Sequence, residues 1–349
     1  MCSRATVPIT LQDDAGRSGV TCHVAAGCLV LPTMSDTSQP PAIRVRGLAK
    51  TWPGGVAAVK GIDFDVAPGE AFGLLGPNGA GKSTTVGMLT TTVVPSAGHA
   101  WLHGHDVAAD PIAARALSAV VFQDAVVDKA LTGRRNLEIH ARLWGVAAGD
   151  AVSRIARLAP EFGIAELLDR PVGTYSGGQR RRLEIARSLL SEPRVLFLDE
   201  PTVGLDPRIR YEILDLVAGL RERTGVTVLL TTHYLDEAER LCDRVAVVHA
   251  GVVVALDTPA NLLATLGQEL LELRVDGDAD RALGVLRREG IAGADAFTIG
   301  TTITVPLHDR PAREVVADVA GLLGGAAITT RRPTLDDVYL RLTGDRLAA

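Results

Sequence analysis

A glycine-rich loop between two expected elements carries the clearest chemistry in the chain. An apolar run over 71–75 leads into GPNGAGKST, which begins at Gly76 and places Lys82 and Ser83 before a helix-compatible stretch. This spacing is that of a P-loop in its required strand–loop–helix context. Glycines let amide N–H groups turn toward phosphate oxygens, and lysine and serine add a charge and a Mg²⁺ ligand. The sequence therefore predicts a nucleotide site, in which the phosphate-binding residues are Gly76, Pro77, Asn78, Gly79, Ala80, Gly81, Lys82, Ser83 and Thr84.

Two adjacent acidic residues follow a second apolar run, at 194–198. Asp199 and Glu200 stand at the carboxyl end of this expected strand, where open α/β sheets bind ligands. Burying two carboxylates is unfavourable unless a cation lies nearby. We therefore assign Asp199 to Mg²⁺ and Glu200 to general-base activation of the attacking water. The alternative interpretation is a solvated turn with two surface acids.

The composition indicates a globular protein of two domains with a linker or tail. The 349 residues are 47% hydrophobic and 22% charged, which is enough apolar material for packed cores. A net charge of −5 provides no global basic field, so no nucleic-acid partner is expected. The longest apolar stretches are about a dozen residues, whereas a membrane-spanning helix needs roughly 20. The four cysteines form no C-x-x-C pair, which argues against a disulfide scaffold or a cysteine metal site.

The first 40 residues are expected to form a disordered extension. They carry scattered charges and lack the continuous apolar segment of a signal peptide. Met34 precedes a polar, proline-terminated leader, SDTSQPP, and is an alternative start of the chain.

Several further motifs follow in one order and together point to a family. The stretch YSGGQ, from Tyr175, is similar to the LSGGQ signature of ATP-binding cassette (ABC) ATPases. Gln123, Asp206 and His233 match the family's Q-loop, D-loop and switch histidine, and Trp52 matches its adenine-stacking ring. Taken singly, most of these residues would be uninformative, and a lone tryptophan is more typical of a core. In register over about 200 residues, they identify the chain as a member of this family.

The resemblance implies an α/β P-loop NTPase fold over residues 41–265. This cassette is expected to contain a parallel sheet core, an antiparallel β subdomain and a helical subdomain over about 124–186. Beyond it, residues 266–349 show short strand and helix patterns in the order βαββαβ, which predicts a small α+β C-terminal domain. A last helix is expected after Thr334, because Thr334 and Asp337 have the spacing of a helix N-cap and its third residue.

The resemblance also implies an active site that is divided between two chains. ATP would be sandwiched between the P-loop of one cassette and the signature of another, while Asp206 reaches the opposite P-loop. Because every catalytic position is present, a homodimer that uses ATP and Mg²⁺ is expected. The implied catalytic residues are Lys82, Gln123, Glu200 and His233; the metal ligands are Ser83, Gln123 and Asp199; the signature residues that bind nucleotide are Ser176, Gly177, Gly178 and Gln179.

The C-terminal PTLDDVYL box resembles that of daunorubicin-resistance type ATP-binding subunits, although a plain amphipathic helix is the alternative. Gln179 and His233 depart from the Met and Gln frequent in that branch and restore the general cassette pattern. The expected function is the ATPase subunit of an ABC-2 type exporter of drug-like or lipid-like substrates, bound through a separate permease at the cytoplasmic face of the cell membrane. The alternatives are export of a polysaccharide or lipid, and a soluble ABC ATPase without a transport role. Arg180–Arg182 begin a helix and are expected to pair with acids rather than with nucleic acid.

Overall fold

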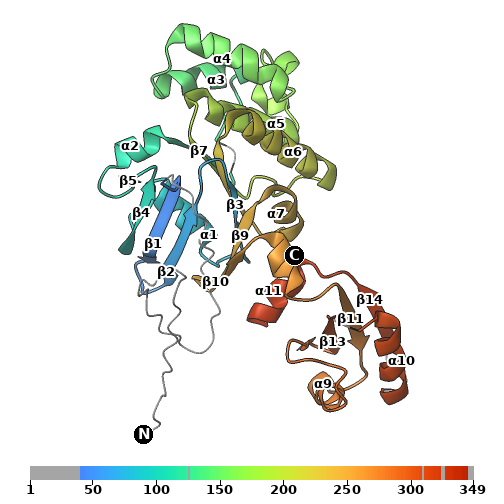
Figure 1. Ribbon diagram of the computed structural model, residues 1–349. Coiled ribbons are helices and arrows are strands. Elements are labelled where there is room, and N and C mark those ends of the chain that lie inside the picture. The colour runs from blue at the N-terminus through green and yellow to red at the C-terminus, as the bar shows by residue number, and fades with distance from the viewer. Residues whose placement is uncertain (1–39, 125, 309, 324–326, 345–349) are drawn as a thin grey trace, which may run out of the picture. The chain divides into compact units, whose positions relative to one another are not determined.

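The computed structural model describes residues 40–124, 126–308, 310–323 and 327–344 (Figure 1). The extension expected over residues 1–40 lies outside the described residues, apart from Pro40. The described chain contains three sheets, of which two build the nucleotide-binding part and the third lies after residue 268. Within the described ranges, no helix has both the length and the apolar character needed to cross a bilayer.

The first sheet is antiparallel and has the strand order β2-β1-β4-β5. Its strands are β1 (Ile43–Thr51), β2 (Ala57–Val66), β4 (Ala97–Leu102) and β5 (His105–Asp106). At the start of β1, buried residues such as Ile43 and Val45 alternate with exposed ones, so one face of the sheet is buried and the other is exposed. These side chains share a core with Phe72 and with Val86 of helix α1 (Lys82–Leu89). The sheet therefore covers the helix that follows the P-loop.

The second sheet has six strands in the order β10-β9-β3-β8-β7-β6, parallel except for β10. The strands are β3 (Ala71–Leu75), β6 (Ser118–Val121), β7 (Val195–Asp199), β8 (Thr227–Thr232), β9 (Arg244–His249) and β10 (Val252–Asp257). Every residue of β3, β7 and β8 is buried, because elements cover both faces of a parallel sheet. Since neighbouring parallel strands end at the same edge, the segments after β3, β7 and β8 lie together there.

The helices around this sheet place the remaining motifs. They are α2 (Pro111–Ala116), α6 (Pro207–Thr224) and α7 (Leu235–Leu241), and α3 (Gly133–Leu143), α4 (Ala148–Glu161) and α5 (Gly177–Ser188) of the helical layer. Short 3-10 turns η1 (Ala165–Leu167), η2 (Val172–Thr174) and η3 (Leu189–Ser191) connect them. Helix α3 contacts both α4 and α5, and Figure 1 shows the three helices side by side. Thr132 starts α3 by accepting the Arg135 N–H at 3.2 Å, a standard N-cap.

The third sheet is antiparallel, with the order β12-β13-β11-β14. After α8 (Pro259–Ala264), its elements run β11 (Glu269–Arg274), α9 (Ala279–Arg288), β12 (Phe297–Ile299), β13 (Thr302–Leu307), α10 (Ala312–Leu322) and β14 (Ala327–Arg331). Leu271 and Leu273 of β11 pack with Leu283 and Val315 of the two helices in a core of their own. This segment has a hydrophobic core separate from those of the first two sheets.

The last helix, α11 (Leu335–Thr343), packs elsewhere. It contacts α7 and α8, and Leu335, Val338 and Tyr339 belong to the core that contains the parallel sheet. The Tyr339 hydroxyl lies 2.8 Å from His249 Nδ1, and the Leu335 N–H donates to Glu239 of α7 at 3.2 Å. The PTLDDVYL box therefore forms a helix that docks on the nucleotide-binding part of the chain.

Candidate nucleotide site

The P-loop holds its lysine in a fixed place. Gly81 caps α1 with a φ of 106°, and a Cβ there would lie 2.5 Å from the Ala58 carbonyl oxygen, so only glycine fits. The Lys82 ammonium donates to the carbonyl oxygens of Gly76 at 2.8 Å and Pro77 at 3.1 Å. The loop thus wraps around its own lysine, which is 3% exposed.

Glu200 pairs with this lysine. Its Oε1 lies 3.1 Å from Lys82 Nζ, and its residue is 5% exposed. Glu200 has a φ of 45°, which is costly for a residue with a Cβ, and its N–H donates to Thr231 O at 3.1 Å and Thr231 Oγ1 at 3.0 Å. Such strain persists where surrounding contacts impose it, and it is concentrated at functional sites. The backbone after β7 therefore turns the Glu200 carboxylate toward the P-loop.

Asp199, one residue before Glu200, is hydrogen-bonded to two hydroxyl groups. Its Oδ1 accepts hydrogen bonds from Ser83 Oγ at 3.1 Å and from Thr231 Oγ1 at 2.5 Å. Carboxylate and hydroxyl oxygens are the ligands that Mg²⁺ prefers. The donor set around Asp199 and Ser83 fits that ion. Sequence reasoning missed Thr231, whose only signal is a hydroxyl within an apolar strand.

His233 completes the cluster from the end of β8. Its Nδ1 lies 3.5 Å from Glu200 Oε2 and is a buried nitrogen without a hydrogen-bond partner in the described chain. The imidazole ring lies 4.1 Å from the Tyr234 ring, measured between centroids. Strands β3, β7 and β8 thus bring Lys82, Glu200 and His233 together, although 151 residues separate the first from the last.

Two other predicted residues lie outside this cluster. The Gln123 side chain is exposed and makes no hydrogen bond within the described residues, while its carbonyl accepts Arg181 Nη2 at 3.3 Å. Trp52 follows β1 and is 39% exposed, with Lys50 Nζ 4.9 Å from its ring centroid. Within the described residues, no hydrogen bond or ion pair joins Gln123 to Ser83 or Asp199. The exposure of Trp52 leaves its indole ring accessible for stacking.

The signature forms a second, separate half of the candidate site. Ser176 caps α5: its Oγ accepts the Gln179 N–H at 3.3 Å, and Gln179 Oε1 accepts the Ser176 N–H at 2.9 Å. A Cβ on Gly178 would meet Ile209 at 2.5 Å, so glycine here allows α5 to approach α6. Asp206 caps α6 by accepting the Ile209 N–H at 3.1 Å. No hydrogen bond or ion pair joins these residues to the P-loop in the part of the chain that the structure describes.

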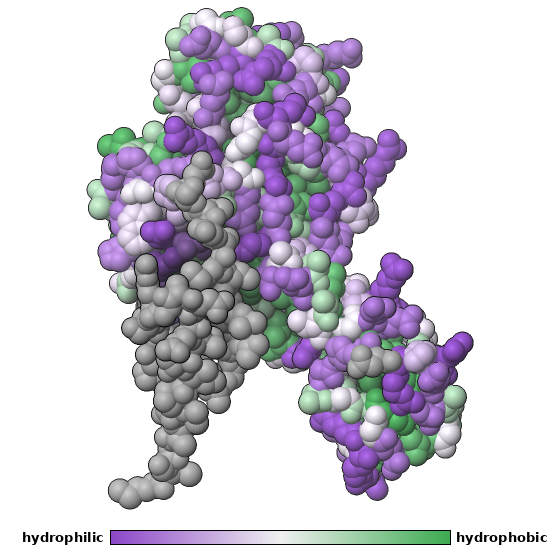
Figure 2. Space-filling view, in the orientation of Figure 1, coloured by the Kyte–Doolittle hydropathy of each residue, from purple (hydrophilic) through white to green (hydrophobic). Residues whose placement is uncertain are grey.

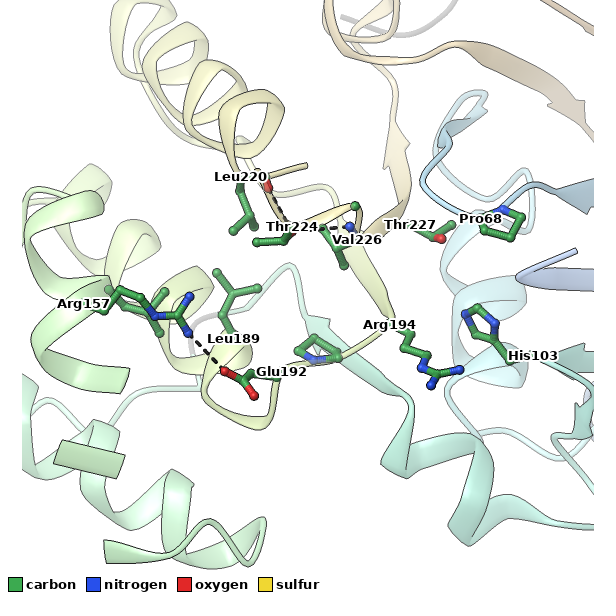
Figure 3. Close-up of a pocket in the computed structure, with 13 residues that line it drawn as sticks. Pro68, His103, Arg157, Leu189, Glu192, Arg194, Leu220, Thr224, Val226 and Thr227 are labelled. Carbon is green, nitrogen blue, oxygen red and sulfur yellow. Dashed lines mark hydrogen bonds and ion pairs between the residues drawn. The ribbon is translucent and has the colours of Figure 1, made fainter. Parts of the chain in front are cut away.

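A large cavity lies away from both halves. It measures about 390 Å³ and is bordered by Arg194 and Thr227, which stand at the amino-terminal ends of β7 and β8 (Figure 3). Figure 3 also shows the Arg157–Glu192 ion pair at its edge. Since the candidate residues lie at the opposite ends of these strands, none of them lines this cavity.

Proteins of known family have sequences similar to this chain. The family model described as ABC transporter matches residues 59–203. The daunorubicin/doxorubicin resistance ATP-binding protein of Streptomyces peucetius is 42% identical over 320 residues, which cover 88% of this chain and 94% of that protein. The chain belongs to the ABC transporter ATP-binding proteins. The Nod factor export ATP-binding protein I of Rhizobium sp. (strain N33) is 37% identical, with 87% and 97% of the two chains covered.

A solved structure supports the same assignment. The ABC protein cbiO1 from Clostridium perfringens, part of the ABC transporter complex cbiONQ, superposes with a TM-score of 0.61 at 30% identity, over 65% of this chain and 92% of that one. The predicted family and P-loop ABC fold are therefore confirmed, and the chain is an ABC-type ATPase that binds ATP.

Sequence reasoning missed one buried acid of this ABC ATPase. Glu237 of α7 is fully buried and accepts hydrogen bonds from Thr232 Oγ1 at 2.6 Å and from Thr202 Oγ1. Arg210 Nε lies 3.5 Å from the same carboxylate. Glu237 thereby connects the loop after Glu200 with the loop that carries His233. The available signal was a glutamate among the buried positions of a short amphipathic helix.

Replacement of Glu237 by alanine is expected to lower the free energy of unfolding by about 3 kcal/mol, because Arg210 and two hydroxyls lose a buried partner.

Burial raises the pKa of Glu237 above its ordinary 4.5. The folded state therefore favours the protonated form of Glu237. Its contribution to the free energy of unfolding is complete below pH 4.5 and is lost as pH rises through the pKa of the folded protein. Urea unfolding should show Glu237→Gln gaining stability relative to wild type over that rise; a constant difference would contradict the titration.

The stacking role of Trp52 can be tested against a matched tryptophan. Trp52→Ala is expected to weaken ADP binding by about 1 kcal/mol, or roughly fivefold in Kd, because the adenine loses an aromatic face. Trp144 is also 39% exposed but lies after α3, so Trp144→Ala should leave the Kd unchanged. Titration calorimetry distinguishes the two, and equal affinities in both variants would remove Trp52 from the site.

Proposed function

We propose that this ABC ATPase is the MgATP-hydrolysing subunit of an ABC-2 type exporter. It works as a homodimer at the cytoplasmic face of the cell membrane, bound to a separate multi-span permease. Its similarity to a daunorubicin/doxorubicin resistance protein and to a Nod factor export protein supports export of drug-like or lipid-like molecules. A polysaccharide or lipid substrate is the second candidate within the same function.

The observation that carries this proposal is the meeting of Lys82, Glu200 and His233 at one edge of the parallel sheet. The P-loop amides and Lys82 bind the β- and γ-phosphates of ATP. Phosphate then takes the place of Glu200 as the partner of the Lys82 ammonium, which leaves the carboxylate available to accept a proton from water. His233 lies beside Oε2, the other oxygen of Glu200, and orients the Glu200 carboxylate. Ser83, Asp199 and Gln123 would hold Mg²⁺, which neutralises charge on the phosphate oxygens.

The second half of each site comes from a partner copy. Helix α5 has 12 residues, and its first N–H groups and the Ser176 hydroxyl form an anion-binding end. Among the described residues of one chain, no hydrogen bond or ion pair joins this end to the P-loop, so its use requires a second cassette in head-to-tail arrangement. Asp206, at the adjacent start of α6, then approaches the opposite P-loop. ATP bridges the two copies, and loss of its γ-phosphate loosens them.

The helical layer is the proposed contact with the permease. It carries exposed apolar side chains that the described chain does not cover, including Leu143 at 80%, Val152 and Val126. Figure 2 shows hydrophobic residues among hydrophilic ones over α3 and α4. Single exposed apolar residues are common on protein surfaces, so these three support a contact only through their place in the layer that contains the signature helix.

The decisive experiment is a search among neighbouring genes for a multi-span membrane protein, followed by co-purification of that protein with this chain in detergent and in nanodiscs. A stable complex whose ATPase rate rises with one class of compound supports export and identifies that class; drug-like cations, lipids and oligosaccharides are the arms. Full ATPase activity without any membrane partner would favour a soluble ABC ATPase instead.

A further inference from the structure

We infer that Arg181 and Glu184 of α5 are positioning residues for ATP hydrolysis, because they fasten the backbone of the Q-loop and of Glu200 to the helix that presents the signature. The pair touches neither nucleotide phosphates nor the attacking water in the proposed mechanism. It acts through the main chain of residues that do. The inference rests on the proposed roles of Glu200, Gln123 and Ser176, and it makes no use of the transported substrate.

The Arg181 guanidinium forms as many hydrogen bonds as it has N–H donors. Its Nη1 donates to Phe122 O at 2.7 Å, and its Nη2 donates to Gln123 O at 3.3 Å and Glu200 O at 3.2 Å. The Nε donates to Pro201 O, and Nη1 also donates to Glu184 Oε2 at 3.0 Å. Five donors are therefore matched by five contacts, four of them backbone carbonyl oxygens. The residue is 6% exposed, so water cannot substitute for these partners.

Glu184 holds the other end of the Q-loop. Its Oε1 accepts the Val126 N–H at 2.7 Å while Oε2 accepts Arg181. Arg187, one turn further along α5, donates to Val126 O at 3.2 Å. Side chains of α5 thus bond the backbone before Gln123, at Phe122, and after it, at Val126. An exposed loop of this kind would ordinarily satisfy its backbone with water.

The contact with Glu200 is the one that bears on chemistry. Glu200 has a left-handed backbone, and Arg181 bonds its carbonyl and that of the next residue, Pro201. Fixing these two peptide groups fixes the direction in which the Glu200 carboxylate points. A general base misplaced by about 1 Å loses on the order of 100-fold in rate.

The same contacts link the two halves of the divided site. Arg181 lies in the second turn of α5, and Ser176 caps its first. Movement of the Glu200 or Gln123 backbone is therefore transmitted to the signature that serves the partner copy. The planar, five-donor fork is required for this, because a lysine ammonium has three donors at one point and cannot serve four separated carbonyls.

The test compares Arg181→Lys with a matched control, Arg154→Lys. Arg154 also bonds a backbone carbonyl, that of Leu190, and pairs with Glu192, but it lies in α4 away from both half-sites. Steady-state ATP hydrolysis by the full chain is measured for each variant. Arg181→Lys is expected to lower kcat about 100-fold with KM within threefold of wild type, since the P-loop is untouched. Arg154→Lys should keep both constants.

Glu184→Gln provides an independent variant of nearly equal volume. It retains an acceptor for the Val126 N–H but removes the charge that partners Arg181. We expect kcat to fall at least tenfold and amide exchange over 118–124 and at Val126 to accelerate, with exchange in β3 unchanged. The positioning role would be overturned if both variants kept the wild-type kcat. It would also be overturned if a lower kcat came with a changed KM and a smaller folded fraction. Failure of the exporter role would appear in the permease experiment and not here.

Discussion

Glu200→Gln is expected to bind ATP and to hydrolyse it about 1,000-fold more slowly than wild type, because the general base is the only group lost. The amide has nearly the volume of the carboxylate and still presents an oxygen toward Lys82, which now lies 3.1 Å from Glu200 Oε1. Phosphate binding is favoured further, since the Lys82 ammonium no longer has to leave an anionic partner. Nucleotide-bound dimers should therefore accumulate.

Two measurements check this result. Single-turnover hydrolysis gives the chemical rate, and light scattering or crosslinking with ATP gives the dimer fraction. Glu192→Gln, at an exposed acid of the helical layer, is the control and should match wild type in both. Hydrolysis by Glu200→Gln at the wild-type rate would refute the base assignment. A nucleotide-saturated variant that stays monomeric, alone and with its permease, would refute the divided site.

Lys82→Ala is expected to abolish measurable ATP hydrolysis through loss of phosphate binding. The P-loop lysine supplies the positive charge at the β- and γ-phosphates, and alanine offers no charge in its place. The structure adds a second effect. Without Lys82, Glu200 keeps a buried carboxylate with no cation beside it, so the nucleotide-free protein should lose about 3 kcal/mol of unfolding free energy.

The two effects can be separated with a double variant. Lys82→Ala/Glu200→Gln should recover much of the lost stability, because the unpaired charge is gone, while ATP binding stays lost. Urea unfolding and nucleotide titration measure the two quantities. Lys129→Ala, at an exposed lysine, should change neither. If the double variant is as unstable as the sum of the single ones, Lys82 and Glu200 are not energetically coupled.

Local sequence pattern predicts best those residues that stand next to an expected strand end. Asp199 ends β7, while Gly76–Thr84 and His233 directly follow β3 and β8. Because parallel strands end at a common edge, the meeting of these residues follows from local pattern and sheet geometry. The expectation that Arg180–Arg182 pair with acids describes Arg182, which bonds Glu212, and only part of what Arg181 does. Arg180 bonds the Tyr175 carbonyl instead.

By itself, the sequence determined the family, the order of the motifs and the chemical groups that each loop presents, because these depend on residue type at fixed local spacing. Tertiary structure alone decided which groups meet: Lys82 with Glu200, Thr231 with Asp199, Glu237 with two loops, and α11 with α7 and α8. The physical reason is clearest at Arg181. Four of its five partners are backbone carbonyl oxygens, and since every residue has one, no amino-acid pattern marks which of them a buried guanidinium will find.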